Sequence, residues 1–254
     1  MALALSDNTS EITRFELNPN KTIGNYYEGY QFGEIWGYET AGYFQTDDEA
    51  RAADQSRLWN GTWMAGDIRY RDLNGDGKIN PGASTVGDPG DRKIIGNSSP
   101  RYAYGLNLGL RYKGFDFGAF IQGIGKRDLM LGGNYFWGFG SEWDVPMVYH
   151  TDYWRPDNTG AEYPRLRFGG GGNFQTQTKY LQNAAYMRLK NLTLGYSLPA
   201  AWINKVKMQR LRVYVSGENI LEFTQLHEAF DPEIPNARDY PLNRALSFGL
   251  QLGL

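Results

Sequence analysis

The C-terminal segment, residues 244–254, alternates between large apolar and small or polar side chains. The apolar set is Leu246, Phe248, Leu250, Leu252 and Leu254, and the residues between them are Ala245, Ser247, Gly249, Gln251 and Gly253. Because successive side chains of a strand point to opposite faces, this pattern predicts a β-strand with one apolar and one polar face. A strand of about ten residues is long enough to cross a lipid bilayer.

The same alternation recurs further upstream. Residues 102–112 place Tyr102, Tyr104, Leu106, Leu108, Leu110 and Tyr112 on one face, opposite Ala103, Gly105, Asn107, Gly109 and Arg111. Residues 192–198 and 209–217 follow the same pattern, and residues 115–125 follow it less regularly. Tyrosines at both ends of a leucine stripe are typical of the aromatic girdles of outer-membrane barrels.

A soluble β-sandwich also alternates, so the pattern alone leaves two fold classes open. Two features favour the membrane barrel. The alternating segments are about ten residues long, whereas strands of soluble proteins usually have about five or six. Their polar faces are rich in Gly, Ala, Ser and Asn, where a face in bulk water would carry more Lys and Glu. We therefore expect an all-β fold: an antiparallel transmembrane β-barrel segment with long extracellular loops and short periplasmic turns.

The connections between these segments alternate in length. Residues 39–100, 126–184 and 220–243 are long connections, whereas Lys113-Gly114 and residues 199–208 are short ones. Since outer-membrane barrels have short periplasmic turns, this alternation places Leu254 at the periplasmic side. A strand near 30–38 and a weaker one before Asn18 bring the expected number to about seven. An open sheet edge does not survive in hydrocarbon, so we expect the chain to be the C-terminal piece of a larger barrel.

Composition excludes several functions. The 254 residues contain no cysteine and two histidines, which excludes disulfide scaffolds, thiol chemistry and histidine-rich metal sites. The net charge of -2 offers no basic excess for a nucleic acid backbone. No run of about 18 apolar residues is present, so no transmembrane helix is expected. The first residues lack the basic flank and apolar core of a signal peptide. No GxSxG nucleophile motif occurs, and we expect no catalytic residues and no enzyme.

Longer motifs are more specific than the alternation. In chain order they are GEIWGYETAGYFQ (33–45), GDIRYRDLNGDGKIN (66–80), IIGNSSPRYAYGLNLG (94–109), GFDFGAFIQGIGKRD (114–128), YMRLKNLTLGYSLP (186–199), LRVYVSGENIL (211–221) and FDPE (230–233). In this order they resemble the C-terminal end of the SusC/RagA-type TonB-dependent outer-membrane transporters of Bacteroidetes. The resemblance covers nearly the whole chain.

This resemblance implies that residues 1–254 are the C-terminal part of a receptor barrel of about 22 strands with a plugged lumen. It further implies import of oligosaccharides or peptides across the cell outer membrane, with a SusD-like surface lipoprotein as partner and TonB as the energy source. The chain shows no plug domain, signal peptide or TonB box, so we expect it to match only about the last quarter of such a transporter. Its last residue, Leu254, also departs from the aromatic residue at which outer-membrane proteins commonly end.

The loop Asp72-Leu73-Asn74-Gly75-Asp76-Gly77-Lys78-Ile79-Asn80 has the spacing of a calcium loop. The expected ligands are the side chains of Asp72, Asn74 and Asp76, the carbonyl of Lys78, and Asn80 directly or through water. Ala83 stands where a calcium loop has its last glutamate, and Asp88 or Asp91 is the candidate to compensate. The alternative is an Asn-Gly and Asp-Gly turn without metal. Calcium is the one cofactor that the sequence suggests, with the role of ordering the loop.

The long connections are rich in aromatic residues. The candidates for contact with a substrate or partner are Trp59, Trp63, Tyr135, Trp137, Trp143 and Trp154. Exposed aromatic rings stack on sugars or bind protein partners. The alternative is that these side chains pack within the loops. They also support a second hypothesis for the whole chain, a secreted or surface β-rich carbohydrate-binding module. On the polar strand faces, Arg111 and Arg212 are expected to form ion pairs on the lumen wall.

Overall fold

The computed structural model describes residues 1–203, 208–234 and 239–253, which form two compact units. The first unit contains residues 1–8, 100–127 and 183–254, and the second contains residues 9–99 and 128–182. Leu254, to which the sequence assigned a place on the apolar face, lies outside the described residues. No helix in the described part of the chain is long and apolar enough to span a membrane.

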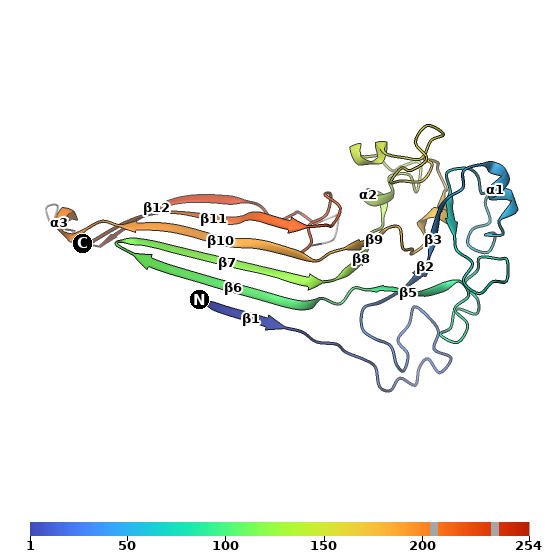
Figure 1. The fold of residues 1–254 in the computed structure, drawn as a ribbon, viewed down its shortest axis with the longest axis horizontal. Coiled ribbons are helices and arrows are strands. Elements are labelled where there is room, and N and C mark those ends of the chain that lie inside the picture. Colours follow the sequence, from blue (N-terminus) through green and yellow to red (C-terminus); the bar gives the residue numbers. More distant parts are fainter. Residues whose placement is uncertain (204–207, 235–238, 254) are drawn as a thin grey trace. The chain divides into compact units, whose positions relative to one another are not determined.

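The first unit is an antiparallel sheet whose six strands are ordered β1-β6-β7-β10-β11-β12 (Figure 1). The strands are β1 (Ala2–Ser6), β6 (Arg101–Tyr112), β7 (Phe115–Lys126), β10 (Tyr186–Ser197), β11 (Arg210–Thr224) and β12 (Ala245–Gly253). This architecture confirms the predicted all-β antiparallel fold. Within residues 1–203, 208–234 and 239–253 the sheet has six strands, where about seven were expected.

The connections alternate in length as predicted. Strands β6 and β7 are joined by Lys113 and Gly114, whose φ angles of 46° and 87° match the type I′ turn that suits twisted hairpins. The register places Arg101 opposite Lys126 and Tyr186 opposite Thr224, so the connections that follow β1, β7 and β11 all leave from one end of the sheet. We call this the loop end, and the opposite end, with Lys113 and Gly114, the turn end.

One face of the sheet is apolar from edge to edge. The register pairs Leu110 with Phe117 and Val215 with Phe248, so apolar side chains of neighbouring strands lie side by side. Those exposed on this face include Leu3, Leu5, Leu110, Tyr112, Phe115, Leu194, Val213, Leu221, Phe223, Leu246, Phe248, Leu250 and Leu252. The most exposed is Phe248, at 84%. An apolar surface of this extent is the surface that a sheet presents to lipid.

A β-bulge at Lys190 makes the pairing of β10 with both of its neighbouring strands irregular. The pairing of β10 shifts between Leu189 and Asn191 with respect to both β7 and β11. The extra residue reverses the phase of the alternation, since each strand residue points opposite to the one before it. Leu189 and Leu192 therefore share the apolar face, and β10 continues to Tyr186 as one strand.

The second unit consists of short elements. Three two-stranded pairs are β2 (Glu34–Tyr38) with β5 (Arg92–Asn97), β3 (Thr40–Tyr43) with β4 (Ile68–Tyr70), and β8 (Asp128–Met130) with β9 (Leu181–Asn183). The helices are α1 (Asp47–Ala52), α2 (Asn134–Trp137) and two 3-10 turns, Val148–Thr151 and Gly171–Phe174; α3 (Ala200–Ile203) belongs to the first unit. The strand expected near 30–38 is β2, but it pairs with β5 and is not part of the large sheet.

The second unit has an aromatic core. Its buried aromatic side chains are Tyr27, Tyr38, Tyr43, Phe44, Trp63, Tyr70, Phe136, Trp137, Trp154, Tyr163 and Tyr180. Asp67 lies among them fully buried, paired with Arg167 at 2.6 Å and accepting a hydrogen bond from the Asn173 amide at 3.0 Å. Burial raises the pKa of Asp67. These bonds join residues 9–99 to residues 128–182, so the two long connections fold as one unit.

Candidate functional site on the polar face of the sheet

The polar face of the sheet is built around an ion pair that spans three strands. Asp116 of β7 and Arg212 of β11 are separated by β10, where Gly195 is paired with Asp116. The Arg212 Nε lies 2.8 Å from the Asp116 Oδ1. A Cβ on Gly195 would lie 2.4 Å from the Arg212 Nη2 and 2.6 Å from the Asp116 Oδ1. Glycine at this position therefore leaves the space in which the two side chains meet.

A second glycine has the same role one strand further along. A Cβ on Gly249 of β12 would lie 2.2 Å from the ring of Tyr214. The Tyr214 ring therefore lies over Gly249, and the Arg212 guanidinium is 4.9 Å from its centroid. Gly195 and Gly249 thus make room for large polar side chains that lie across the strands.

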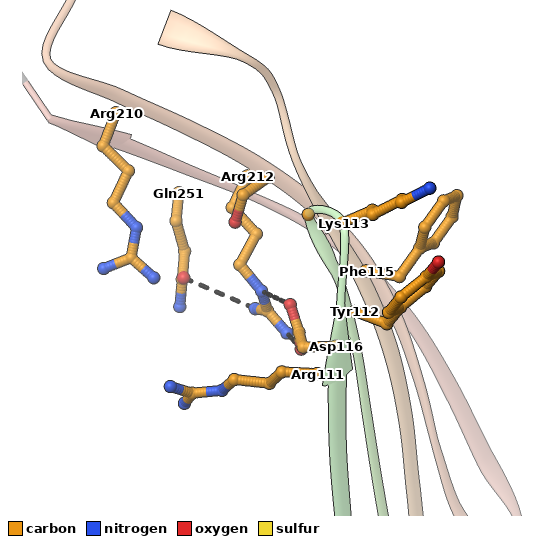
Figure 2. A pocket seen from close by; sticks show the side chains of 10 residues that line it. Arg111, Tyr112, Lys113, Phe115, Asp116, Arg210, Arg212 and Gln251 are labelled. Atoms are coloured by element: carbon orange, nitrogen blue, oxygen red, sulfur yellow. Dashed lines mark hydrogen bonds and ion pairs between the residues drawn. The ribbon is translucent and has the colours of Figure 1, made fainter.

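The ion pair forms one wall of a pocket of about 450 Å³ at the turn end. Arg111, Arg210, Arg212, Asp116 and Gln251 line it and point to the same side of the sheet, as Figure 2 shows. The Gln251 Oε1 accepts a hydrogen bond from the Arg212 Nη1 at 3.4 Å. We call this the arginine pocket.

The other side of the turn end is aromatic. Tyr112, Lys113 and Phe115 also line the pocket, but in Figure 2 their side chains extend to the opposite side from those of Arg111 and Arg210. Phe115 packs on Tyr196 with ring centroids 4.5 Å apart, and Tyr112 is 70% exposed. Aromatic rings at the end of an apolar band are typical of a membrane–water interface.

A second charged cluster lies at the loop end of the polar face. Arg188 of β10 is buried and forms ion pairs with Glu222 of β11, with Asp231 at 3.0 Å and with Glu233 at 2.6 Å. Lys190 binds Glu233 at 3.1 Å. A buried arginine with this number of carboxylates is fully paired, and it ties the connection after β11 to the sheet.

Asp231 links Arg188 to the backbone of the connection after β11, and we call this the Arg188–Asp231 tie. Its Oδ2 also accepts the N–H of Leu242 at 3.2 Å, and its Oδ1 accepts the N–H of Glu233 at 2.9 Å. Burial alone would raise the pKa of Asp231, but the Arg188 guanidinium and the two N–H donors outweigh it and hold this pKa below its usual range. Phe230 is buried beside it, so this segment, which contains the FDPE motif, packs on the sheet.

The aromatic candidates of the sequence separate into two groups. Trp63, Trp137 and Trp154 are buried in the core of the second unit, which agrees with the alternative that such residues pack within the loops. Trp59 is half-buried, with its ring 5.7 Å from that of Trp63. Tyr135 is 45% exposed and Trp143 is 85% exposed. Of the six candidates, these last two present a ring surface to a ligand or partner.

The Asp72 loop forms a set of turns closed by its own side chains. The Asp72 carboxylate accepts the N–H groups of Gly75 at 2.6 Å and Gly77 at 2.8 Å, and these bonds hold its pKa below the usual range. Asp76 accepts the N–H of Lys78 at 2.8 Å and side-chain bonds from Asn74 and Asn80. Among the described residues, no group of three or more Asp, Glu or His side chains is placed to hold a metal ion.

The two acids expected to compensate for Ala83 bind backbone groups. Asp91 is fully buried and accepts the N–H groups of Leu73 at 2.9 Å and Asn80 at 2.7 Å. Asp88 accepts the N–H of Ala83 at 3.0 Å. Asp91 thus fixes the backbone at both ends of the loop through hydrogen bonds to Leu73 and Asn80.

Sequence reasoning found part of the polar face. The expected ion pair of Arg212 is confirmed, with Asp116 as its partner on the polar face of the sheet. Arg111 was placed on the correct face, but no ion pair with it is present among the described residues. The Arg188 cluster was missed, because the bulge at Lys190 hid the face to which Arg188 belongs. The signal that was available is the FDPE segment, whose two acids match the two cations at 188 and 190.

Similarity to known proteins agrees with this two-faced sheet. The chain is 33% identical over 227 residues to the TonB-dependent receptor P3 of Formosa agariphila, a match that covers 89% of this chain and 21% of that protein. It is 28% identical over 190 residues to the TonB-dependent receptor SusC of Bacteroides thetaiotaomicron, covering 73% of this chain and 17% of SusC. The chain thus spans about a fifth of the length of the curated relatives that it matches. No protein-family model matches it.

The fold also matches a solved structure. The RagAB peptide transporter superposes on 99% of this chain and on 27% of its own matched chain, with a TM-score of 0.68 and 23% sequence identity. The same transporter in its open-open state gives a TM-score of 0.66. The fold is that of the RagA barrel, and the six-stranded sheet seen in the described part of the chain does not close into a barrel by itself.

Proposed function

Since this chain is homologous to TonB-dependent receptors, SusC among them, we propose that it forms part of the barrel wall of a nutrient importer in the cell outer membrane. The homologues are receptors and transporters, which supports a function without catalysis. The proposed role of the chain is to separate lipid from a polar passage and to position loops at the outer end of that passage.

The observation that carries this proposal is the difference between the two faces of the sheet. The apolar face exposes Phe248, Leu250 and their neighbours, whereas the polar face holds the Asp116–Arg212 ion pair. Alternation of this kind puts one face in hydrocarbon and the other in a water-filled lumen. A soluble carbohydrate-binding module would bury its apolar face in an internal core, so the exposed face favours the importer.

Adjacent residues of β6 provide the test. In the whole receptor that contains this chain, with any other cysteines removed, Leu108→Cys and Asn107→Cys place a thiol on the apolar and polar faces, respectively. We expect a water-soluble maleimide to label only the Asn107→Cys variant in native outer membranes, and a lipid-soluble maleimide to label the Leu108→Cys variant. Equal labelling of both by the water-soluble reagent would contradict a membrane wall.

The proposal includes two partners. A SusD-like surface lipoprotein is supported by the homology to SusC and by the fold shared with the RagAB transporter. TonB is supported by the description of the relatives as TonB-dependent. Affinity purification of the tagged whole receptor from its native membranes tests the first partner, since a stoichiometric lipoprotein is expected to co-purify. Loss of uptake in a tonB deletion strain tests the second.

The proposed cargo is an oligosaccharide or a peptide. Growth of a receptor deletion strain on single oligosaccharides and single peptide mixtures is the discriminating measurement, because loss of growth on one class identifies the cargo. Normal growth on every member of both classes would contradict an importer of either. We further propose that Tyr135 and Trp143, the exposed aromatic candidates, contact the cargo or the lipoprotein.

We also propose calcium as a structural cofactor of the Asp72 loop. The support is the spacing of Asp72, Asn74 and Asp76, whose side-chain oxygens lie in one exposed loop shaped by Asp91. Calcium prefers such carboxylate and amide oxygens, and its role here is to order the loop.

A further inference from the structure

The arginine pocket contains more positive charge than its own acid neutralises. Three guanidinium groups, those of Arg111, Arg210 and Arg212, line it with the single carboxylate of Asp116, which leaves two positive charges among these four groups. Lys113 also lines the pocket and adds a further positive charge. Asp116 is paired with Arg212. Among the residues that the structure describes, neither Arg111 nor Arg210 forms an ion pair. A water-filled pocket with two unneutralised guanidinium groups attracts anions.

The strands fix the backbone positions from which these two side chains extend. Arg111 lies at the end of β6 and Arg210 at the start of β11, and both point to the same side of the sheet as Asp116 (Figure 2). Guanidinium groups bind carboxylates and sulfates through two parallel N–H donors, which gives geometric selectivity as well as attraction. The pocket of about 450 Å³ is within the size range of small-ligand sites.

We propose that the arginine pocket binds the carboxylate or sulfate group of an acidic oligosaccharide. Arg111 and Arg210 take the oxyanion, and Gln251 and Ser197, which also line the pocket, provide neutral hydrogen-bonding groups for the neighbouring hydroxyls. This assignment rests on the proposed importer function and names its substrate class as acidic glycans. Asp116 limits the attraction by neutralising Arg212, so a bound anion is released again, as a transport site requires.

Direct binding tests the proposal independently of import. The probes are trigalacturonate and its methyl ester, titrated calorimetrically into the whole receptor in detergent at constant ionic strength. We expect the acid to bind, the ester to bind at least about tenfold more weakly, and sodium sulfate to displace the acid. Equal binding of acid and ester would overturn the proposal, as would tighter binding of triglutamate than of trigalacturonate, or no displacement by sulfate.

Substitutions locate the binding. Arg111→Gln and Arg210→Gln are each expected to weaken trigalacturonate binding about tenfold. Arg244→Gln removes the same charge from an exposed arginine just before β12, at the loop end, and is expected to bind as the wild type does. Should Arg111→Gln not assemble in the membrane, Arg111→Lys replaces it as the test variant. This substitution keeps the charge but removes the planar guanidinium, which donates two parallel N–H bonds to an oxyanion. Unchanged binding by the Arg111 and Arg210 variants would overturn the site, while an importer of neutral cargo would remain.

Discussion

Asp116 and Arg212 form an ion pair that passes over an intervening strand, because Gly195 of β10 has no side chain between them. The pair is partly shielded, with 25% of the Asp116 and 12% of the Arg212 side chain exposed. It links β7 to β11 across β10 in addition to the backbone ladder. The ion pair therefore requires a glycine at position 195.

Gly195→Ala is expected to displace this ion pair. The new Cβ would overlap both charged groups, so we expect the receptor to lose about 1–3 kcal/mol of stability. Gly118→Ala is the matched control. Gly118 of β7 lies on the same polar face of the sheet as Gly195, but no atom lies within 4 Å of a Cβ added to it. The midpoint of heat-induced unfolding, read from the gel mobility of the membrane protein, measures the difference. Equal midpoints for the two variants would show that Gly195 has no such role.

The apolar face predicts a strong position dependence for charged substitutions. Leu108→Arg in the middle of β6 is expected to destabilise the membrane-inserted protein by about 2–4 kcal/mol, since it puts a guanidinium into hydrocarbon. Asn107→Arg, one residue away on the polar face, is expected to change stability by less than about 1 kcal/mol. The amount of heat-modifiable protein in purified outer membranes is the readout. A larger loss for Asn107→Arg would reverse the assignment of the faces.

How far the sequence predicts the sheet depends on strand regularity. Residues 102–112 alternate without interruption, and the predicted segment nearly coincides with β6. For β10, the sequence pattern showed only 192–198, because the bulge at Lys190 shifts Leu189 and Met187 out of phase with Leu192. The alternation of side chains is regular only between bulges. A bulge is set by how a strand pairs with its neighbours, and the sequence of one segment carries no information about that pairing.

The functional residues were predicted less completely, for a related reason. Arg210 and Arg212 share a face of β11 by alternation along that strand, but Asp116 and Gln251 join them only through the register of β7, β10, β11 and β12. The Arg188 cluster also depends on a connection that folds back on the sheet. Burial of an aromatic residue is equally non-local: Trp137 and Trp143 belong to the same connection, yet one is 7% and the other 85% exposed.

These two tryptophans give a paired prediction. Trp137→Ala removes a ring that packs on Phe174 and Tyr180, with centroid distances of 4.7 and 4.8 Å, and is expected to destabilise the second unit by about 3–5 kcal/mol. Trp143→Ala is expected to change stability by less than about 0.5 kcal/mol and to weaken capture of cargo or lipoprotein. Limited proteolysis of residues 128–182 and co-purification of the lipoprotein separate the two effects. A fully stable Trp137→Ala variant would contradict the aromatic core.

Arg188 is expected to control the connection after β11. Arg188→Ala leaves Glu222, Asp231 and Glu233 without their shared partner, a loss of about 3–5 kcal/mol for a buried ion pair. Hydrogen exchange of the amides in 226–234 should then become much faster. Lys190→Ala removes a single ion pair to Glu233 that is more exposed than those of Arg188, and it is expected to have a smaller effect. Equal exchange in both variants would remove Arg188 from this role.

The same segment should respond to acid. The pKa of Asp231 is lower in the folded protein than in the unfolded chain, so its contribution to stability is present above the unfolded pKa of about 4 and is lost as the pH falls through the folded value. We expect amide exchange in 226–234, corrected for its intrinsic pH dependence, to rise below about pH 4. Asp231→Asn should remove this acid response. A segment that exchanges equally at every pH in the wild type would count against the Arg188–Asp231 tie.

Calcium binding by the Asp72 loop has its own pH dependence. The N–H groups of Gly77 and Gly75 lower the pKa of Asp72, so this carboxylate stays ionised, and able to bind calcium, as the pH falls through the range where an ordinary aspartate is protonated. Terbium luminescence, with calcium as competitor, should therefore persist at pH 4 in the wild type and be lost in Asp72→Asn and Asp76→Asn. Asp48→Asn, an exposed acid of α1, is the control and should leave the signal unchanged. If all four proteins give the same signal, the loop is a metal-free turn, which its internal hydrogen bonds already close.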